Sequence, residues 1–145
     1  MMGGFVLINR SDVIRIKIPF PDISSDLAVT SHMYICHCIV GNTLGFVKCQ
    51  TLKPYMLIAT PIKHYWDEMP DITRNPFLRA TRIDCDKDFI THDVRYDDRL
   101  KTTVRPNVCE DVMHCVDHEL ICDGYISNHI AKDDLIFLND LISHI

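Results

Sequence analysis

Glycine is scarce in this sequence, with 5 among 145 residues, and neither of the two common glycine-rich phosphate-binding loops occurs. No Cys-x-x-Cys pair occurs among the seven cysteines, so neither a zinc ribbon nor a thioredoxin-type redox pair is indicated. The longest apolar runs fall far short of the roughly 20 residues that span a bilayer. The N-terminus has no cationic region before its short apolar stretch, so we expect neither a signal peptide nor a membrane segment.

The chain also lacks an excess of positive charge. Its formal net charge is −5, with 15 Lys and Arg against 20 Asp and Glu. Non-specific binding to phosphates draws its affinity from a basic surplus, so any contact with nucleic acid must be local. A length of 145 residues with 47% hydrophobic and 24% charged residues is typical of one ordered globular domain, which we expect to cover residues 1–145.

The odd number of cysteines favours reduced thiols over a disulfide framework. In a reducing compartment such residues act as small buried hydrophobes, and we therefore expect a cytoplasmic protein. Cys36 and Cys38 are two apart in an expected strand, so the alternation of a strand places them on one face and His37 on the other. This pattern favours core packing of the two thiols over metal binding.

The order of the predicted elements indicates an α+β or mainly β barrel class, because short strands come first and helices follow. Loops are expected at 23–31 and 60–76, and the charged stretch 90–104 is expected to be a solvated surface segment. A helix capped by Asn107 should run to Leu120 and end at Gly124, and a last helix is expected over 131–142. The predicted strands cover residues 12–18, 33–40, 44–49, 55–59 and 77–84.

Six side chains flank the two long loops and could together cleave or bind a phosphodiester. A histidine offers an acid/base group near neutral pH, a threonine offers a hydroxyl, and the cations can hold a phosphate. We predict that a bent sheet brings the two loop ends to one mouth. These residues are His32, Thr60, Lys63, His64, Arg79 and Arg82.

The segment from Ser11 to Ser24, which contains Pro19-Phe20-Pro21-Asp22, resembles the opening of the PemK/MazF-like toxins. Residues 56–62 resemble that family's hydrophobic strand and the loop after it, and residues 77–89 resemble its later strand and turn. The resemblance implies a small SH3-like antiparallel β-barrel with C-terminal helices, a homodimer, and cleavage of single-stranded RNA without metal or cofactor. It also implies an antitoxin protein as partner.

On this resemblance, residues 1–90 form the barrel core, 91–125 an insertion, and 126–145 the C-terminal helix. The family's arginine-proline pair at the start of the second strand is replaced here by Ser31-His32-Met33. His32 is therefore assigned the acid/base role, Thr60 the contact to the reacting phosphate, and Arg82 the neutralisation of charge. Lys63, His64 and Arg79 are the predicted substrate-binding residues.

Two alternatives remain open from the sequence. A non-catalytic protein of the same barrel class could bind another protein through its loops or through the acidic segment 91–104, in which Asp97 and Asp98 lie. His114 and His118 are four residues apart on the predicted helix and could supply half of a zinc site, although no second ligand pair lies nearby in the sequence.

Overall fold

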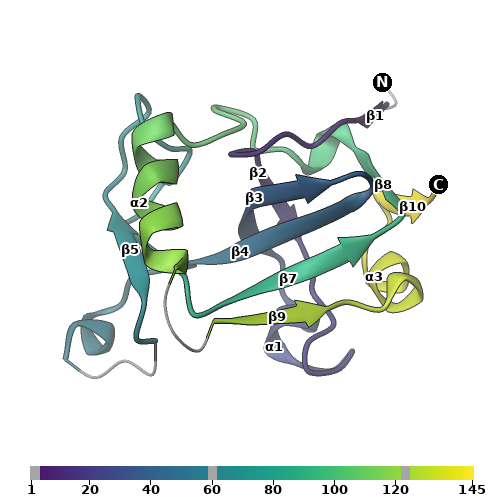
Figure 1. The fold of residues 1–145 in the computed structure, drawn as a ribbon, viewed down its shortest axis with the longest axis horizontal. Helices are drawn as coiled ribbons and strands as arrows, with labels where there is room; N and C mark the ends of the chain where they lie inside the picture. Colours follow the sequence, from purple (N-terminus) through teal and green to yellow (C-terminus); the bar gives the residue numbers. More distant parts are fainter. Residues whose placement is uncertain (1–3, 59–61, 122–124) are drawn as a thin grey trace.

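The computed structural model describes residues 4–58, 62–121 and 125–145 of the chain. Strands dominate and a few short helices connect them, so the predicted α+β class is confirmed (Figure 1). The elements in chain order are β1 Phe5–Val6, β2 Val13–Ile16, α1 Asp26–Val29, β3 His32–Val40, β4 Thr43–Thr51, the 3₁₀ helix η1 Pro54–Leu57, β5 Tyr65–Glu68, β6 Thr81–Asp84, β7 Lys87–His92, β8 Val94–Asp97, the 3₁₀ helix η2 Asp98–Leu100, α2 Glu110–Leu120, β9 Ile126–His129, α3 Lys132–Leu138 and β10 Ile142–His144.

The larger sheet is organised around β4, which has β3 along one edge and two different strands along the other. Its first half pairs with β7, from Thr43 to Phe46, and its second half pairs with β6, from Cys49 to Thr51. The strand order β2-β3-β4-β6-β5 therefore continues on one branch, while β7 and the parallel strand β9 form the other. Strands β6 and β7 are separated only by Cys85 and Asp86, where the chain bends, and between the pairs Ile83–Cys49 and Phe89–Phe46 five residues of this edge lie opposite two of β4.

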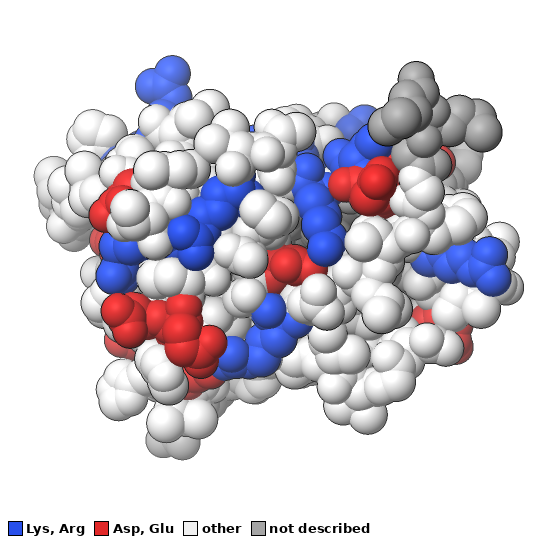
Figure 2. All heavy atoms as spheres, turned by 90° about the horizontal axis from the view of Figure 1, so that it is seen from above, with Lys and Arg blue, Asp and Glu red and all other residues white. Residues whose placement is uncertain are grey.

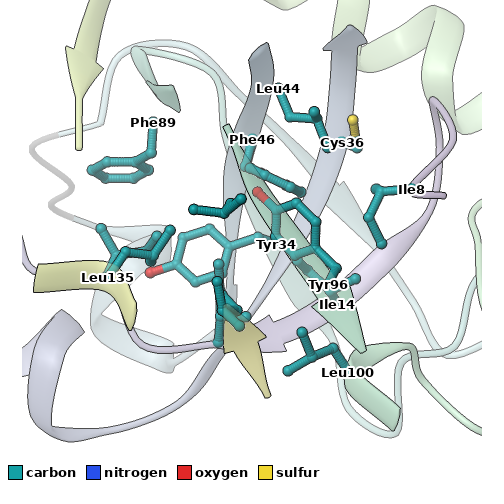
Figure 3. Packing of buried hydrophobic residues seen from close by; sticks show 14 of the residues in the cluster. Ile8, Ile14, Tyr34, Cys36, Leu44, Phe46, Phe89, Tyr96, Leu100 and Leu135 are labelled. Atoms are coloured by element: carbon teal, nitrogen blue, oxygen red, sulfur yellow. The ribbon is translucent and has the colours of Figure 1, made fainter. Parts of the chain in front are cut away.

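The two faces of this sheet carry separate cores. One face, here called the β8 face, packs against the small sheet β1-β8-β10 and α3, and Figure 3 shows Ile14, Tyr34, Phe46 and Tyr96 meeting there. The other, the α2 face, packs its side chains against Val112, Met113 and Val116 of α2. Helix α2 stands at the left of Figure 1, beside β5, and strands β8 and β10 lie at the right. Successive strand residues point to opposite faces of the sheet, and each face is covered by other elements, so the apolar residues on both faces are buried.

A β-bulge interrupts β3 and corrects the prediction for its cysteines. Cys36 pairs with Phe46, but Cys38 pairs with Gly45, so one additional residue is inserted between the two pairs. Cys36 is fully buried in the β8 core, as expected for a core thiol. The bulge, however, places Cys38 on the opposite face beside His37, and the prediction that Cys36 and Cys38 share a face is wrong.

Four further sequence predictions differ from the structure. Residues 54–57 form a 3₁₀ helix in place of a strand, because Pro54 at its first position has the helical φ but no N–H for a ladder. The expected loop 60–76 contains the strand β5, and the expected loop 23–31 contains α1. The last helix ends at Leu138, and the chain then forms β10.

The stretch 90–104 was expected to be solvated, and this prediction is wrong for residues 90–100, whereas Thr103 and Val104 are exposed. Val94, Tyr96 and Leu100 are all buried in the β8 core, and β8 is the middle strand of the smaller sheet. The error arose because charged residues alternate with buried apolar ones in β8. Arg95, for example, lies between two buried residues, so the segment as a whole has a low apolar content although Val94 and Tyr96 belong to the core.

Helix α2 confirms the predicted helix in position and amphipathic face, although it begins at Glu110 after Cys109, and Asn107 lies outside it. Its predicted end at Gly124 lies outside the described residues. None of the described helices has the length and apolar character needed to cross a membrane.

Candidate functional site

His32 begins β3 with one ring nitrogen held by the backbone. Its Nδ1 lies 2.9 Å from the carbonyl oxygen of Thr30. A carbonyl can only accept, so Nδ1 carries the proton and Nε2 is left with its lone pair. Within the described residues Nε2 has no hydrogen-bond partner. Burial, followed by the positive charge of Lys48, lowers the pKa of His32, so the ring is neutral at pH 7 and can accept a proton.

Arg82 is a buried and fully engaged cation. Its guanidinium donates to both carboxylate oxygens of Asp67, at 2.8 Å each, and to the carbonyl oxygen of Met56 at 3.0 Å. The ring of Tyr65 lies 3.6 Å from the guanidinium carbon, and the side chain of Arg82 is 1% exposed. The described structure thus gives Arg82 the role of a cross-strand link between β5 and β6.

The residues predicted around position 60 lie in different surroundings. Thr60 is outside the described residues. The backbone N–H groups of Lys63 and His64 both donate to Asp86, at 2.9 and 2.8 Å, which fixes the approach to β5. The His64 ring lies 3.6 Å from Glu119 of α2, and its side chain is therefore on the α2 face.

His32 and His64 lie on opposite faces of the sheet. Met33, next to His32 in β3, packs into the α2 core, so alternation directs His32 to the β8 face. The register Ile16 to His32 places His32 on the same face as Ile16, which belongs to the β8 core. Of the predicted groups, His32 and His64 are therefore not brought into one pocket.

Arg79 lies in a hollow of about 440 Å³ at the end of the sheet, here called the basic hollow. Arg15 of β2 lines the same hollow from the other side, together with the hydroxyl-bearing residues Thr51 and Thr103. Both arginines are exposed, and neither has a hydrogen-bond or ion-pair partner within the described residues. Two guanidinium groups from distant segments thus share a hollow with hydroxyls and no neutralising carboxylate, a combination suited to a phosphate.

Two further cations of the basic hollow are already paired. Arg99 donates to both oxygens of Asp97 at 2.9 Å, and Lys101 lies 2.9 Å from the buried carboxylate of Asp12. The Arg99 hydrogen bonds lower the pKa of Asp97 to about 2. These pairs order the wall of the hollow and leave Arg15 and Arg79 as its free charges.

Arg15 was not among the residues predicted from sequence. The sequence did contain a signal for it, namely a charged residue inside an apolar strand, and Arg15 is the one exposed position of Val13-Ile14-Arg15-Ile16. Sequence alternation shows that such a residue faces outward, but it cannot show that Arg79, more than sixty residues later, faces the same hollow.

The histidine pair of α2 lies at the surface. His114 and His118 are both exposed, and His114 lies 3.6 Å from Glu110 of its own helix. Among described residues, the three-ligand group that could hold a metal ion consists of His37, Cys38 and Asp88 instead. Burial, followed by the charge of Asp88, raises the pKa of Cys38, so its thiol is not an activated nucleophile at neutral pH.

Charges of both signs share the face seen in Figure 2. Lys and Arg side chains lie interspersed with Asp and Glu, and no broad area of one sign covers this face. Attraction of a polyanion to this face must therefore depend on a few unpaired cations at short range, as the net charge already indicated.

No protein-family model, curated protein or solved structure matches this chain.

Proposed function

We propose that this protein binds single-stranded RNA, with a backbone phosphate held in the basic hollow between Arg15 and Arg79. The observation that carries the proposal is that these two arginines share one hollow and lack any carboxylate partner among the described residues. A guanidinium group can donate two parallel hydrogen bonds to a phosphate, and the hydroxyls of Thr51 and Thr103 can add further donors.

We further propose that the protein is a toxin-like endoribonuclease in which His32 acts on an RNA strand passing the end of β3. Met33, which follows His32, lines the basic hollow, whereas His32 faces the β8 side, so a strand held in the hollow would have to pass around the start of β3 to reach His32 Nε2. His32 Nε2 would take the proton of a ribose 2′-hydroxyl, the 2′-oxygen would attack phosphorus, and the bond from phosphorus to the 5′-oxygen would break, with the 5′-oxygen taking a proton from water. The products are a 2′,3′-cyclic phosphate and a 5′-hydroxyl, and no metal takes part.

The resemblance of residues 11–90 to PemK/MazF-like toxins supports this proposal and extends it. On that basis we propose that the larger sheet is an SH3-like barrel, that the active form is a homodimer, and that an antitoxin protein binds it. The bend of the chain between β6 and β7 and the branching of β4 are compatible with such a barrel.

The binding proposal is tested by fluorescence anisotropy with labelled single-stranded RNA in the presence of a chelator. We expect Arg15→Ala and Arg79→Ala each to weaken binding about tenfold, since each removes a charge-assisted contact to phosphate. Arg95→Ala is the control, because Arg95 is also exposed but lies on β8, over the ring of Phe5 and at the other end of the sheet from the basic hollow. Equal affinities for all three variants would contradict the proposed site.

Cleavage is tested separately on a denaturing gel, again with chelator. The wild type should produce fragments ending in a cyclic phosphate, and His32→Gln should not. Retained cleavage by His32→Gln would exclude the assigned role of His32. Binding without cleavage in the wild type would leave the basic hollow as a binding site and remove the nuclease proposal.

A second candidate function, protein binding, is favoured by an apolar hollow of about 370 Å³ at the other end of the sheet. Phe5, Leu7, Ile39 and Ile145 line it, and Leu7 is 82% exposed. Exposed apolar patches of this kind occur at protein interfaces. The acidic segment is a poorer candidate, because Asp97 is paired with Arg99.

We propose that a second copy of the chain covers this apolar hollow. Light scattering after size-exclusion chromatography should give a dimer mass for the wild type and a monomer mass for Leu7→Asp. Dimers of unchanged stability in Leu7→Asp would place the interface elsewhere.

A further inference from the structure

Three potential metal ligands lie close together at the bulged end of β3. The sequence pattern had predicted that two of them, His37 and Cys38, point to opposite faces. The bulge directs both His37 and Cys38 to the same side of the sheet, and Asp88 reaches this side from β7. One ligand atom from each residue lies within 4.8 Å of the other two. Because β4 lies between β3 and β7, the group is assembled across three neighbouring strands over Gly45.

Three polar contacts of this group meet at a single atom, His37 Nε2. Asp88 Oδ2 lies 2.7 Å from it, the Tyr125 hydroxyl 3.5 Å, and Cys38 Sγ 3.8 Å. A ring nitrogen can make one good in-plane hydrogen bond, so one proton cannot serve these three partners together. In a Cys-His-Asp catalytic triad the thiol and the carboxylate face different ring nitrogens, and this geometry is therefore unsuited to a triad.

Gly45 leaves the space in which the three ligand atoms meet. A Cβ at this position would lie 2.5 Å from Cys38 Sγ, 3.1 Å from His37 Nε2 and 3.2 Å from Asp88 Oδ2. Any larger residue would thus displace the very atoms of the group. Glycine in a strand interior is otherwise unfavourable, and close approach of other atoms is a recognised reason for it.

The burial of the Asp88 carboxylate is a second observation that favours a bound cation. The side chain of Asp88 is 2% exposed, its Oδ2 faces His37, and its second oxygen, Oδ1, is buried without a hydrogen bond of good geometry within the described residues. Burial alone would raise the pKa of this carboxyl, but hydrogen bonds, with Ser127 among the donors, lower it. A buried carboxylate oxygen without a donor is costly, and a cation relieves that cost. The Tyr125 hydroxyl donates to Asp88 Oδ2, as the outer partners of metal-bound carboxylates commonly do.

We infer that His37, Cys38 and Asp88 form a binding site for a divalent transition metal of the zinc type. Imidazole, thiolate and carboxylate are all established zinc ligands, whereas calcium and magnesium prefer oxygen alone. Thiolate and carboxylate together carry two negative charges, which balance those of the ion in a largely buried site. Zinc ligands at 2.0–2.3 Å from the metal lie roughly 3–4 Å from one another, so small side-chain shifts would complete the shell.

Three protein ligands leave a fourth tetrahedral position for water or another ligand. His37 is 11% exposed, so the site is reached from solvent although Asp88 is not. Its β3 ligands His37 and Cys38 lie five and six residues along the strand from His32, roughly 17 to 20 Å at the rise of a strand, so the site is separate from the basic hollow. The inference does not depend on RNA binding.

The test uses purified full-length protein, stripped with chelator and titrated with Co²⁺ as a spectroscopic probe for zinc. We expect one equivalent to bind, with a thiolate-to-cobalt charge-transfer band and intense visible bands of a tetrahedral site, both removed by added Zn²⁺. Cys38→Ser should lose the charge-transfer band and bind at least tenfold more weakly. The controls are Cys115→Ser and His114→Gln on α2. They change a cysteine and a histidine outside the proposed site, so both variants should bind Co²⁺ as the wild type does.

A second variant covers the case in which Cys38→Ser folds poorly. Gly45→Ala keeps all three ligands but intrudes among them, so it should also weaken Co²⁺ binding, and circular dichroism reports whether its fold is retained. Zn²⁺ should raise the melting temperature of the wild type and not that of either variant. Absence of stoichiometric binding by the wild type, or an unchanged charge-transfer band in Cys38→Ser, would overturn the inference.

Discussion

The β5–β6 edge and the basic hollow both carry arginines, but the arginines are paired with carboxylates at the edge and unpaired in the hollow. At the edge, Arg82 and Arg74 each donate two hydrogen bonds to a carboxylate, Asp67 and Glu68 respectively. In the hollow, Arg15 and Arg79 have no such partner within the described structure. The comparison shows that the position of acidic groups, and not the number of cations, decides which arginines can bind a ligand.

Sheet register explains why Arg79 and Arg82 differ although they are three residues apart. Arg82 lies opposite Asp67 in the β5–β6 ladder, where directly paired side chains share a face. Arg79 precedes β6 and is not part of the ladder. The same short segment thus supplies one structural cation and one free cation.

The largest expected effect is the loss of the carboxylate that faces Arg82. Asp67→Asn removes the charge that compensates a guanidinium with 1% exposure, and we expect the free energy of unfolding in urea to fall by about 3 kcal/mol. Arg79→Ala is the control from the hollow and should change it by less than about 0.5 kcal/mol. Equal losses in both variants would remove the distinction between the two regions.

A smaller loss is expected at Glu68, the second carboxylate of the edge. Its side chain is buried and accepts hydrogen bonds from Trp66, Arg74 and Asn75, at 2.8 to 3.0 Å. Glu68→Gln removes the charge and introduces an N–H facing donors, so stability should fall by about 2 kcal/mol. Glu119→Gln, at a partly exposed carboxylate near His64, should change stability by less than about 0.5 kcal/mol; a larger loss there would contradict this ranking.

The smallest expected effect is a pH dependence from His32, which precedes Met33 in β3 and faces the β8 side of the sheet. Its pKa in the folded protein is lowered, first by burial, so protonation favours the unfolded chain. The stability it contributes is present above pH 6.5 and is lost as pH falls from there through the folded pKa. His32→Gln should therefore lose less stability than the wild type on acidification, by under about 1 kcal/mol.

The control for this pH dependence is His114→Gln, which makes the same change on the exposed surface of α2. Urea unfolding at a series of pH values compares the three proteins. A wild-type profile identical to that of His32→Gln would show that burial does not affect this histidine.

Much of the fold was predictable because strong periodicity marks its central elements. The alternation at 12–18, the apolar run at 33–40 and the helical spacing after Val108 correspond to β2, β3 and α2. Strands with buried residues between charged ones, such as β8, were missed because burial depends on a partner sheet that lies elsewhere in the sequence.

The candidate sites were less predictable than the fold, since each depends on register. His32 and Arg79 were identified as chemical candidates from loop position, but Arg15 joins Arg79 only through the sheet. The ligand group needs the bulge at Cys36 to Cys38, where the period of two fails. A strand that obeyed its sequence pattern would place His37 and Cys38 on opposite faces, and no metal site would be expected there.

The central claim, that the two unpaired arginines of the basic hollow hold RNA phosphate, is tested most directly by the salt dependence of RNA affinity. Each phosphate contact to a single strand contributes about 0.7 to the slope of log affinity against log salt concentration. Because the two arginines hold one phosphate, the account predicts that the double variant Arg15→Ala, Arg79→Ala has a slope smaller by about 0.7, while Arg95→Ala keeps the wild-type slope. A double variant with the wild-type slope would show that phosphate is not held in the hollow.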